Sequence, residues 1–492
     1  MRSRGATVVW MGWAAAACAL LLMAVRVTDA LSLRQPMQAI TSGAEFEALF
    51  AIWKFINGEA VYQDPYRIPF AASYYNWLFY AFYGAFAGLG QKLLGLNDWW
   101  LPTLTKVATL SLCAAGSALL ARLLRLVAGD SGFWRDLAWP LSLCFFFGPL
   151  IGYWAIAVTC ELGAVVSAVA ALLVFLRWYP TRPTAATVAA ALLAAAAWSF
   201  KQSNIFVGAT LFLFLLVRRQ WRLAALSLAI PVAVVGFSGW IGGQAYRDMA
   251  FLKKQTMFFA WWQLGRNLGN LLVKTTPYLA MVALIPVALS RLPGGLRAAW
   301  RDDRLLLALI GLGVSAVLSI PASAKTAAAE NYYFVMVVFM IFAGIATLAR
   351  VEPMPWTRRL VGAGFALYAV ACLLVVAGVT GVTSVADSHR RNVEQAACIK
   401  DVARPLYIND VHLSLPWFAL EGPYFVLATI YWEDRQLGMT FERDGVGGLI
   451  RDGAFATIAI GVGAEPVWDG QHFDRYQKTS SCGGLDLYSR QN

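Results

Sequence analysis

Residues 332–349 read Tyr-Tyr-Phe-Val-Met-Val-Val-Phe-Met-Ile-Phe-Ala-Gly-Ile-Ala-Thr-Leu-Ala, without a charged side chain, and Arg350 follows directly. An apolar helix of ~20 residues crosses a bilayer, and this stretch is nearly that long. Comparable runs occupy residues 7–27, 101–128, 137–157, 158–178, 184–200, 203–217, 221–242, 276–291, 305–321 and 359–381. The sequence therefore predicts about eleven transmembrane helices, of which the first resembles an uncleaved helix more than a signal peptide because no clear small-x-small cleavage site follows it.

The composition agrees with a membrane protein. Of 492 residues, 59% are apolar and 14% charged, and the mean hydropathy is +0.59, whereas a soluble protein carries roughly a quarter charged residues. These values exclude a cytosolic enzyme, a disordered chain and a secreted disulfide scaffold. The net charge of +12 comes mainly from Arg at the ends of apolar runs, so we expect membrane lipids and not nucleic acid as the charged partner.

Arginine clusters fall at alternate connections between the runs. They are Arg2 and Arg4; Arg122, Arg125 and Arg135; Arg177 and Arg182; Arg218, Arg219 and Arg222; Arg291, Arg297, Arg301 and Arg304; and Arg350, Arg358 and Arg359. The positive-inside rule places these connections and the N-terminus in the cytoplasm. Residues 28–100, 243–275 and 382–492 are then expected outside.

Two outer segments have the pattern of helices that lie along a membrane. Residues 74–95 begin with Tyr, Trp and Phe, a composition typical of an interface helix, and a crossing there would reverse the alternation of the Arg clusters. We expect them either to lie along the outer membrane face or to dip into the membrane and return. In residues 41–58 an apolar face opposes Glu47 and Lys54, with Glu45 at its border. We therefore expect an amphipathic helix on the outer surface.

Glu45 is the first candidate catalytic residue. Ser42-x-x-Glu45 is a capping box, in which the Glu side chain returns to the helix N-terminus, and this structural interpretation is the commoner one. In the alternative, a carboxylate at the membrane boundary takes a proton from an acceptor hydroxyl. Glu47 is the neighbouring candidate for the same role.

Glu161 stands between two apolar runs that are joined by almost no loop. A Glu in this setting either snorkels or bonds between helices, or it is a second acid facing the same cavity as Glu45. The second interpretation includes a divalent ion bound by oxygen ligands of Glu45 and Glu161. All three His residues lie after residue 381 without metal-ligand spacing, so a His-built zinc site is not expected.

Lys201 and Lys325 are cations in apolar outer connections. A phosphate group carried by a lipid needs such a point charge. Snorkelling to lipid headgroups is the alternative for either side chain. If neither Lys faces Glu45, the phosphate site is sought at Arg67, Arg247 or Arg266.

Residues 382–492 form a separate polar tail. They contain 10 Lys and Arg against 14 Asp and Glu, a net charge of −4, while the rest of the chain carries +16. Residues 405–408 and 455–460 have the pattern of short strands, with Gly-rich turns at 445–448 and 461–463. The tail is expected to be a small extracytoplasmic α/β domain in which Cys398 and Cys482 either form a disulfide or remain as two thiols.

This layout resembles the GT-C superfamily of integral-membrane glycosyltransferases, which includes bacterial lipid A aminoarabinose transferases and protein O-mannosyltransferases. The similar motifs are the first outer loop from Glu45 through Tyr62 to Pro65 with its aromatic helix, the second acid, Glu161, the Lys201-Gln202 pair, and Lys325 followed by Asn331-Tyr332-Tyr333. The chain departs from the usual first-loop Asp-Glu pair, which is Ala44-Glu45 here, and from the double Pro, which is Pro69-Phe70.

The resemblance implies a fold and an activity. A membrane domain, residues 1–381, would carry an inverting transfer of one sugar from a polyprenyl phosphate to a lipid, glycan or protein hydroxyl on the outer face of a bacterial inner membrane. Glu45, Glu47 and Glu161 would be catalytic, Lys201, Lys325 and Arg67 would bind phosphate, and Gln202, Asn331, Tyr332, Tyr333 and Tyr62 would line the substrate cavity. A lipid-linked solute transporter or flippase and a non-catalytic cell-envelope scaffold are the alternatives.

Overall fold

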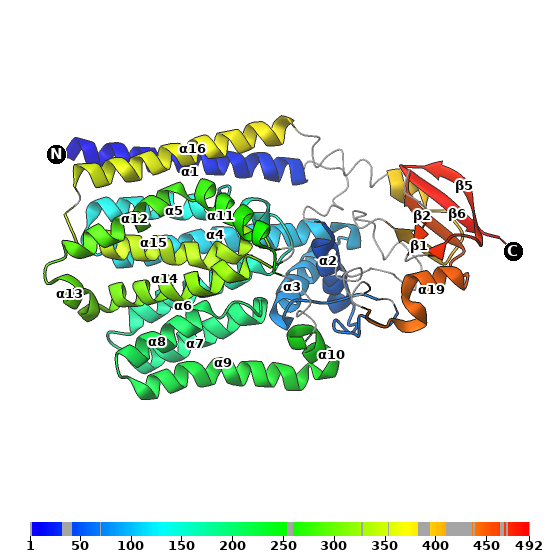
Figure 1. The fold of residues 1–492 in the computed structure, drawn as a ribbon, viewed down its shortest axis with the longest axis horizontal. Helices are drawn as coiled ribbons and strands as arrows, with labels where there is room; N and C mark the ends of the chain where they lie inside the picture. The colour runs from blue at the N-terminus through cyan, green and yellow to red at the C-terminus, as the bar shows by residue number, and fades with distance from the viewer. Residues whose placement is uncertain are drawn as a thin grey trace.

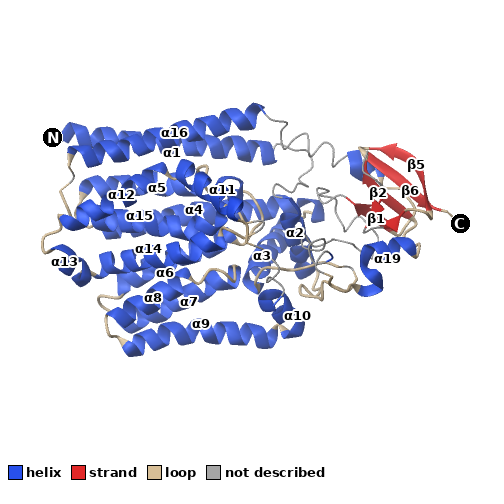
Figure 2. Ribbon diagram, in the orientation of Figure 1, coloured by secondary structure: helices blue, strands red, loops and turns tan. Residues whose placement is uncertain are grey.

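The computed structural model describes residues 2–31, 42–68, 70–252, 259–325, 328–352, 354–381, 394–409, 435, 438–462, 467–468 and 471–491. It consists of a helical bundle and, at one end, a small domain with a β-sheet (Figures 1 and 2). The longer helices of the first part are α1 (Arg2–Leu31), α2 (Ser42–Ile56), α3 (Trp77–Leu94), α4 (Leu101–Ala128), α5 (Gly132–Phe147), α6 (Glu161–Trp178), α7 (Pro183–Phe200), α8 (Phe206–Val217), α9 (Trp221–Ile241), α11 (Trp261–Lys274), α12 (Thr276–Ser290), α14 (Asp303–Ala322), α15 (Phe334–Leu348) and α16 (Pro355–Gly381).

Helix α15 is the centre of the bundle. Every residue from Phe334 to Leu348 is buried, and α12, α14 and α4 pack against the helix. A helix that is apolar on all sides belongs in such an interior. This uncharged stretch therefore lies mainly among other helices, whereas α9 and α16 expose most of their apolar side chains.

Among the described residues, eight helices are long and apolar enough to cross a membrane, as in a multi-pass membrane protein. Helices α11 and α12 add a ninth if this pair, bent by 91°, is one span. Two of the eleven expected runs are too short as helices. Helix α5 ends at Phe147, before Gly148-Pro149, and α8 has 12 residues, which rise only about 18 Å against a hydrocarbon core of about 30 Å. Both nevertheless lie within the bundle (Figure 1).

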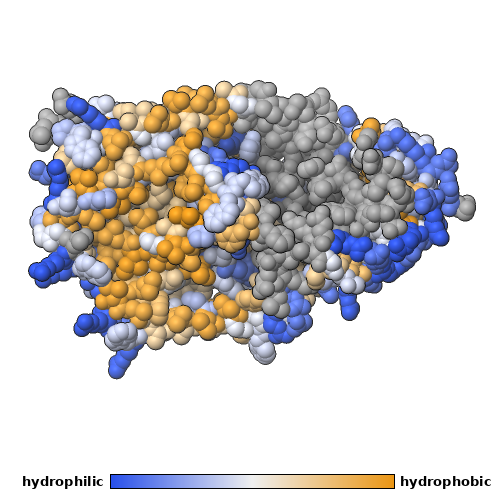
Figure 3. Space-filling model, viewed as in Figure 1, coloured by the Kyte–Doolittle hydropathy of each residue, from blue (hydrophilic) through white to orange (hydrophobic). Residues whose placement is uncertain are grey.

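Polar and apolar surfaces are segregated along the bundle. An apolar band covers its middle, and hydrophilic atoms gather at the end that carries the N-terminus (Figures 1 and 3). The short helix α13 (Gly295–Arg301) lies at this end. Two ion pairs join the start of α14 to the chain after α8 and after α15: Arg218 Nη2 lies 2.5 Å from Asp303 Oδ1, and Arg350 Nε lies 2.6 Å from Asp302 Oδ2.

Helices α2 and α3 lie at the opposite end of the bundle, toward the C-terminal domain (Figure 1). Helix α3 is not among the candidate spans, as expected for residues 74–95. The expectation of a surface-lying α2 is wrong, because Glu47 and Lys54 are as buried as the apolar residues Leu49 and Ile52. The cause is that other segments cover the polar face: Lys54 Nζ donates to Val61 O and Gln63 Oε1 of the following loop.

The segment between α9 and α12 contains α10 (Gly243–Arg247), a π-helical turn (Asp248–Leu252) and α11. Trp261 and Trp262 of α11 are 75% and 65% exposed, and Arg266 lies over the Trp262 ring. Exposed Trp and Arg at a helix start are typical of a membrane interface. Lys253 and Lys254 lie outside the described residues.

The C-terminal domain has a four-stranded sheet in the order β1-β2-β6-β5. Strand β1 (Leu406–Asn409) runs parallel to β2 (Thr457–Gly461), and β6 (Leu485–Arg490) is antiparallel to both β2 and β5 (Tyr476–Cys482). A second ribbon pairs β3 (Val467–Trp468) with β4 (Gln471–His472). Both predicted strands are confirmed, but residues 445–448 are wrongly expected as a turn, because they begin helix α19 (Gly445–Arg451), which packs its apolar side under the sheet.

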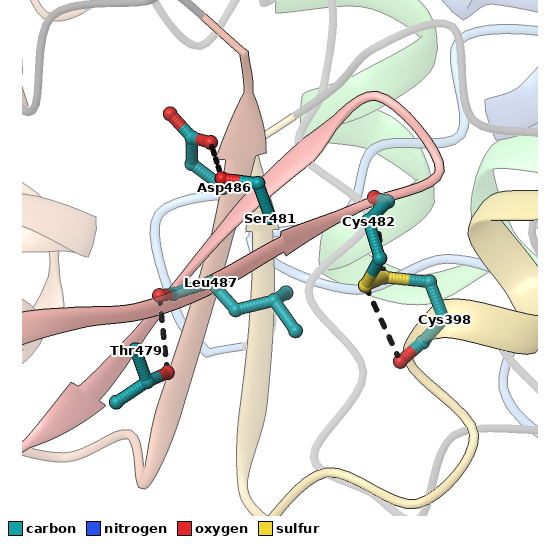
Figure 4. Close-up of a disulfide and its surroundings, with 6 residues drawn as sticks. All are labelled: Cys398, Thr479, Ser481, Cys482, Asp486 and Leu487. Carbon is teal, nitrogen blue, oxygen red and sulfur yellow. Dashed lines mark hydrogen bonds between the residues drawn. A yellow bond between two sulfur atoms is a disulfide. The ribbon is translucent and has the colours of Figure 1, made fainter.

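Cys398 and Cys482 form a disulfide with Cα atoms 5.8 Å apart, so the first of the two alternatives is confirmed (Figure 4). The bond ties the segment before β1 to the end of β5. On the neighbouring strands Ser481 Oγ donates to Asp486 Oδ1 and Thr479 Oγ1 donates to Leu487 O. The edge of the sheet is thereby fixed to the chain that enters the domain.

The loop between α2 and α3 docks onto this domain. Glu442 N donates to Tyr66 O at 2.8 Å, and Ile68 N donates to Glu442 Oε2 at 3.1 Å. Phe70 is fully buried in the apolar core of the domain, with its ring centroid 5.8 Å from that of Phe441. Tyr66, Ile68 and Phe70 therefore belong to the C-terminal core although they are far away in the sequence.

Candidate functional site

The candidate acids converge on the chain that precedes α6. Glu45 of α2 is fully buried, and its Oε1 accepts a hydrogen bond of 3.1 Å from Val158 N. Val158 lies three residues before Glu161, the first residue of α6. The structure thus brings α2 to the same stretch that carries the second acid, and gives one Glu45 oxygen a partner outside its own helix.

Buried charges surround Glu45. Lys106 of α4 is 1% exposed, and the Glu45 carboxylate attracts it electrostatically. Glu47 is also buried. Burial raises the pKa of Tyr75 well above its usual value, and the nearby Cys160 and Glu161 raise it further, so this phenol stays neutral and can donate a hydrogen bond.

Glu161 is held by two donors. Lys201 Nζ lies 2.9 Å from its Oε1, and Asn331 Nδ2 donates to the same oxygen at 2.7 Å. Its place in the first turn of α6 also suits the helix dipole. The carboxylate is 4% exposed, so these interactions hold a charge that would be costly in isolation.

Close packing of α6 and α7 positions the ion pair. A Cβ atom on Gly163 would lie 2.4 Å from the Phe200 ring, so only glycine allows the end of α7 to approach α6 this closely. Lys201 follows Phe200 in an extended conformation that ends the helix. The absence of a side chain at Gly163 thereby brings the Lys201 ammonium to Glu161.

Lys201 remains a cation in this setting. Burial lowers the pKa of Lys201, but the Glu161 carboxylate is among the groups that raise it, and together these groups raise it by more than burial lowers it. The net pKa is therefore above the ordinary Lys value. The ammonium also lies 4.8 Å from the centroid of the Tyr332 ring. The Glu161 carboxylate and the Tyr332 ring together form a cation-binding site that the Lys201 ammonium occupies.

A small cavity adjoins this pair. Its volume is about 20 Å³, and Glu161, Lys201, Asn204, Asn331 and Tyr332 are among the residues that line it. Glu161 Oε2, Asn204 Oδ1 and Asn331 Oδ1 are buried without a hydrogen-bond partner among the described residues. Three of the residues that line the cavity thus carry an unpartnered acceptor oxygen, and a fourth carries the ammonium; the size of the cavity suits about one water molecule.

Gln202 and Tyr62 hold the first loop against this region. Gln202 Nε2 donates to Tyr74 O at 2.7 Å, and the Tyr62 hydroxyl donates to Tyr75 O at 2.8 Å. These two predicted cavity residues thus bind main chain and fix the start of the aromatic helix. Tyr333 is fully buried and bonded to Ser323 Oγ at 2.5 Å.

The other predicted phosphate ligands lie elsewhere. Lys325 pairs its main chain with Phe259 in an isolated bridge and is not among the residues that line the cavity at Glu161. Arg67 has a 78% exposed side chain, 3.9 Å from Asp64. The structure therefore groups Lys201, Asn331 and Tyr332 with Glu161, and it does not join Lys325 or Arg67 to them.

The donor set does not favour a divalent ion at Glu45 and Glu161. Within the described ranges, no three His, Cys, Asp or Glu side chains lie close enough to share a metal. Lys201 already neutralises Glu161. A cation there would have to displace this ammonium.

Lys106 and the ion pair between Lys274 and Glu330 were not predicted from the sequence. Lys106 is an ionisable residue inside an apolar run, and that alone marks a functional candidate. Lys274 and Glu330 are separated by 56 positions, and no local sequence pattern pairs them.

No protein-family model and no curated protein matches this sequence.

Proposed function

We propose that this protein is an integral-membrane glycosyltransferase of the GT-C type. It moves one sugar from a polyprenyl phosphate to a hydroxyl of a lipid, glycan or protein, at the membrane face where the C-terminal domain lies. The observation that carries the proposal is the cavity lined both by Lys201 and by three residues with unpartnered acceptor oxygens, Glu161, Asn204 and Asn331. A phosphate needs the cation, and the hydroxyls of a sugar need the acceptors.

The reaction assigns a role to each group. The acceptor oxygen forms a bond to the anomeric carbon while the bond from that carbon to the phosphate oxygen breaks on the opposite face, which inverts the centre. Lys201 stabilises the charge left on the polyprenyl phosphate. A carboxylate, Glu45 with Glu47 as the alternative, takes the acceptor proton.

Substrate binding requires a conformational change. A cavity of about 20 Å³ cannot hold a sugar, since ligand pockets measure ~300–1,000 Å³. The donor phosphate replaces the Glu161 carboxylate at Lys201, which frees Glu161 and Asn331 to bind sugar hydroxyls. Glu45 takes the proton once the 157–161 segment has moved away from it.

The orientation belongs to the same proposal. Ion pairs at the arginine-rich end join the connections before α14 and after α8 and α15, which fits a shared cytoplasmic side. In a bacterial inner membrane the C-terminal domain, with its disulfide, would then be extracytoplasmic.

A scaffold function is the second candidate, because Glu45 and Glu161 both have structural partners, Val158 N and Lys201. Activity decides between the two. Mass spectrometry of envelope lipids and glycans from a deletion strain and its parent identifies any missing sugar and its acceptor.

Complementation then tests the residues. Glu45→Gln, Glu161→Gln and Lys201→Met should each lower the transfer by about 10²-fold or more at unchanged protein levels. Lys92→Met, which alters an exposed Lys near the end of α3, should not. Activity retained in Glu45→Gln but lost in Glu47→Gln would move the base to Glu47. Full activity in all these variants, or an unchanged envelope in the deletion strain, would overturn the proposed function.

A further inference from the structure

An open pocket lies at the arginine-rich end of the bundle, away from the candidate active site. Its volume is about 460 Å³, within the range of ligand sites. It lies between the end of α4, the turn that joins α6 to α7, and the start of α14. Its lining includes Leu126, Leu176, Arg177, Trp178, Arg182 and Arg304.

Three guanidinium groups face this pocket without a counter-charge. Two acidic side chains at this end, Asp302 and Asp303, already pair with Arg350 and Arg218. Among the described residues, Arg177, Arg182 and Arg304 have no carboxylate within ion-pair distance. The pocket therefore carries a formal charge of about +3, since Arg stays protonated at any working pH.

One of these groups is oriented. Arg304 Nη1 donates to Leu126 O at 2.8 Å, which uses one donor and leaves the rest of the planar fork available. Arg177 and Arg182 are exposed and come from the two sides of one turn. Guanidinium forks bind phosphate oxygens in pairs of hydrogen bonds.

The pocket also lies where membrane spans end. Candidate span α6 ends at Trp178, and α7 begins at Pro183. The Trp178 side chain is 44% exposed, as is usual for an aromatic anchor at the headgroup level. With Leu126 and Leu176, it gives the basic pocket an apolar wall on the side of the spans.

We propose that this pocket binds the phosphodiester headgroup of an anionic phospholipid. The phosphate lies among Arg177, Arg182 and Arg304, and the glycerol and first acyl carbons pack against Trp178 and Leu126. A basic pocket beside apolar span ends fits such an amphipathic anion better than a free ion. The site is independent of the proposed sugar transfer, because none of its residues contacts the cavity at Glu161.

The test uses the full-length protein in neutral detergent and native mass spectrometry. Dioctanoyl phosphatidylglycerol, dioctanoyl phosphatidylcholine and inorganic phosphate are titrated separately into wild type, the double variant Arg177→Gln/Arg182→Gln and the control Arg297→Gln. Arg297 is exposed on α13 at the same end and does not line the pocket. Melting temperatures establish that each variant is folded.

The proposal expects wild type to prefer phosphatidylglycerol over phosphatidylcholine. The double variant should bind phosphatidylglycerol about tenfold more weakly, because it lacks two exposed ionic contacts to the phosphate, and the control should match wild type. Inorganic phosphate that binds as tightly as the lipid would make this a free-anion site and overturn the proposal. An equal loss in Arg297→Gln, or no loss in the folded double variant, would also overturn it. If the double variant does not fold, the single variant Arg182→Gln decides by the same criteria.

Discussion

Removing both members of the Glu161–Lys201 pair should destabilise the protein no more than removing either one alone. At 2.9 Å and an effective dielectric constant of about 20, two unit charges attract by about 6 kcal/mol, which the loss of hydration largely offsets. Lys201→Met leaves the 4% exposed Glu161 carboxylate with only the Asn331 bond. Glu161→Gln leaves the ammonium with the Tyr332 ring. Each single variant should therefore lose about 3 kcal/mol.

The double variant Glu161→Gln/Lys201→Met buries no uncompensated charge. It should lose about 3 kcal/mol as well, which corresponds to a coupling energy of about 3 kcal/mol between the two side chains. The assay is unfolding of the detergent-solubilised protein by SDS, followed by circular dichroism. The control cycle uses Arg443 and Asp452, whose side chains are 49% and 45% exposed and whose coupling should stay below ~1 kcal/mol.

Additive effects at Glu161 and Lys201 would refute this reasoning. Coupling below about 0.5 kcal/mol is the expectation for independent sites. Such a result would mean that the two charges do not meet in the membrane-embedded protein, and the cavity beside them would lose its ammonium as well.

Three further predictions concern Lys54, the disulfide and Lys106. Burial lowers the pKa of Lys54 to about 8, below the value near 10.4 in the unfolded chain. Because the unfolded state binds more protons between these two values, the free energy of unfolding should rise from pH 8 to pH 10, by at most ~3 kcal/mol relative to Lys54→Met. Thermal melts of both proteins at both pH values measure this rise. Cys398→Ser/Cys482→Ser opens a link across 84 positions and should cost the C-terminal domain about 4 kcal/mol, seen as faster trypsin cleavage after residue 381; cleavage at the wild-type rate would contradict this. Lys106→Met should destabilise the protein by about 3 kcal/mol because it leaves the Glu45 charge buried, and adding Glu45→Gln should recover part of that loss in the SDS titration; a purely additive loss would show that the two charges do not interact.

The spans could be predicted where their signal is local. The apolar runs at 101–128, 184–200 and 305–321 appear as helices with nearly the expected bounds. The length of α5 was wrong because the hydropathy of 137–157 is continuous through Gly148-Pro149, where the helix ends. The location of α2 was wrong for a different reason: its periodicity separates two faces but does not say that the loop after it covers the polar one.

The candidate site was predictable residue by residue but not as a set. Glu161, Lys201 and Asn331 each stand out as polar groups in apolar surroundings, yet their contact depends on Gly163 admitting Phe200 and on the turn that begins at Glu330. These contacts depend on packing between residues far apart in the sequence, which produces no periodic pattern in the sequence. The same holds for the separation of Lys325 from Lys201, since both lie in similar outer connections.

The loop between α2 and α3 links the C-terminal domain to the candidate site through only a few residues of chain. Its residues 66–68 bond to Glu442, and Phe70 is buried in the core of that domain. Phe70 has φ 64°, a conformation that costs a non-glycine residue about 1 kcal/mol and persists here because the domain holds its ring. Four residues later, Tyr74 O accepts the hydrogen bond of Gln202, the neighbour of Lys201. Because this loop is short and fixed at both ends, we expect a displacement of the domain to reach the Lys201 connection, and the proposed opening of the cavity at Glu161 to change the loop or its hydrogen bond with Gln202.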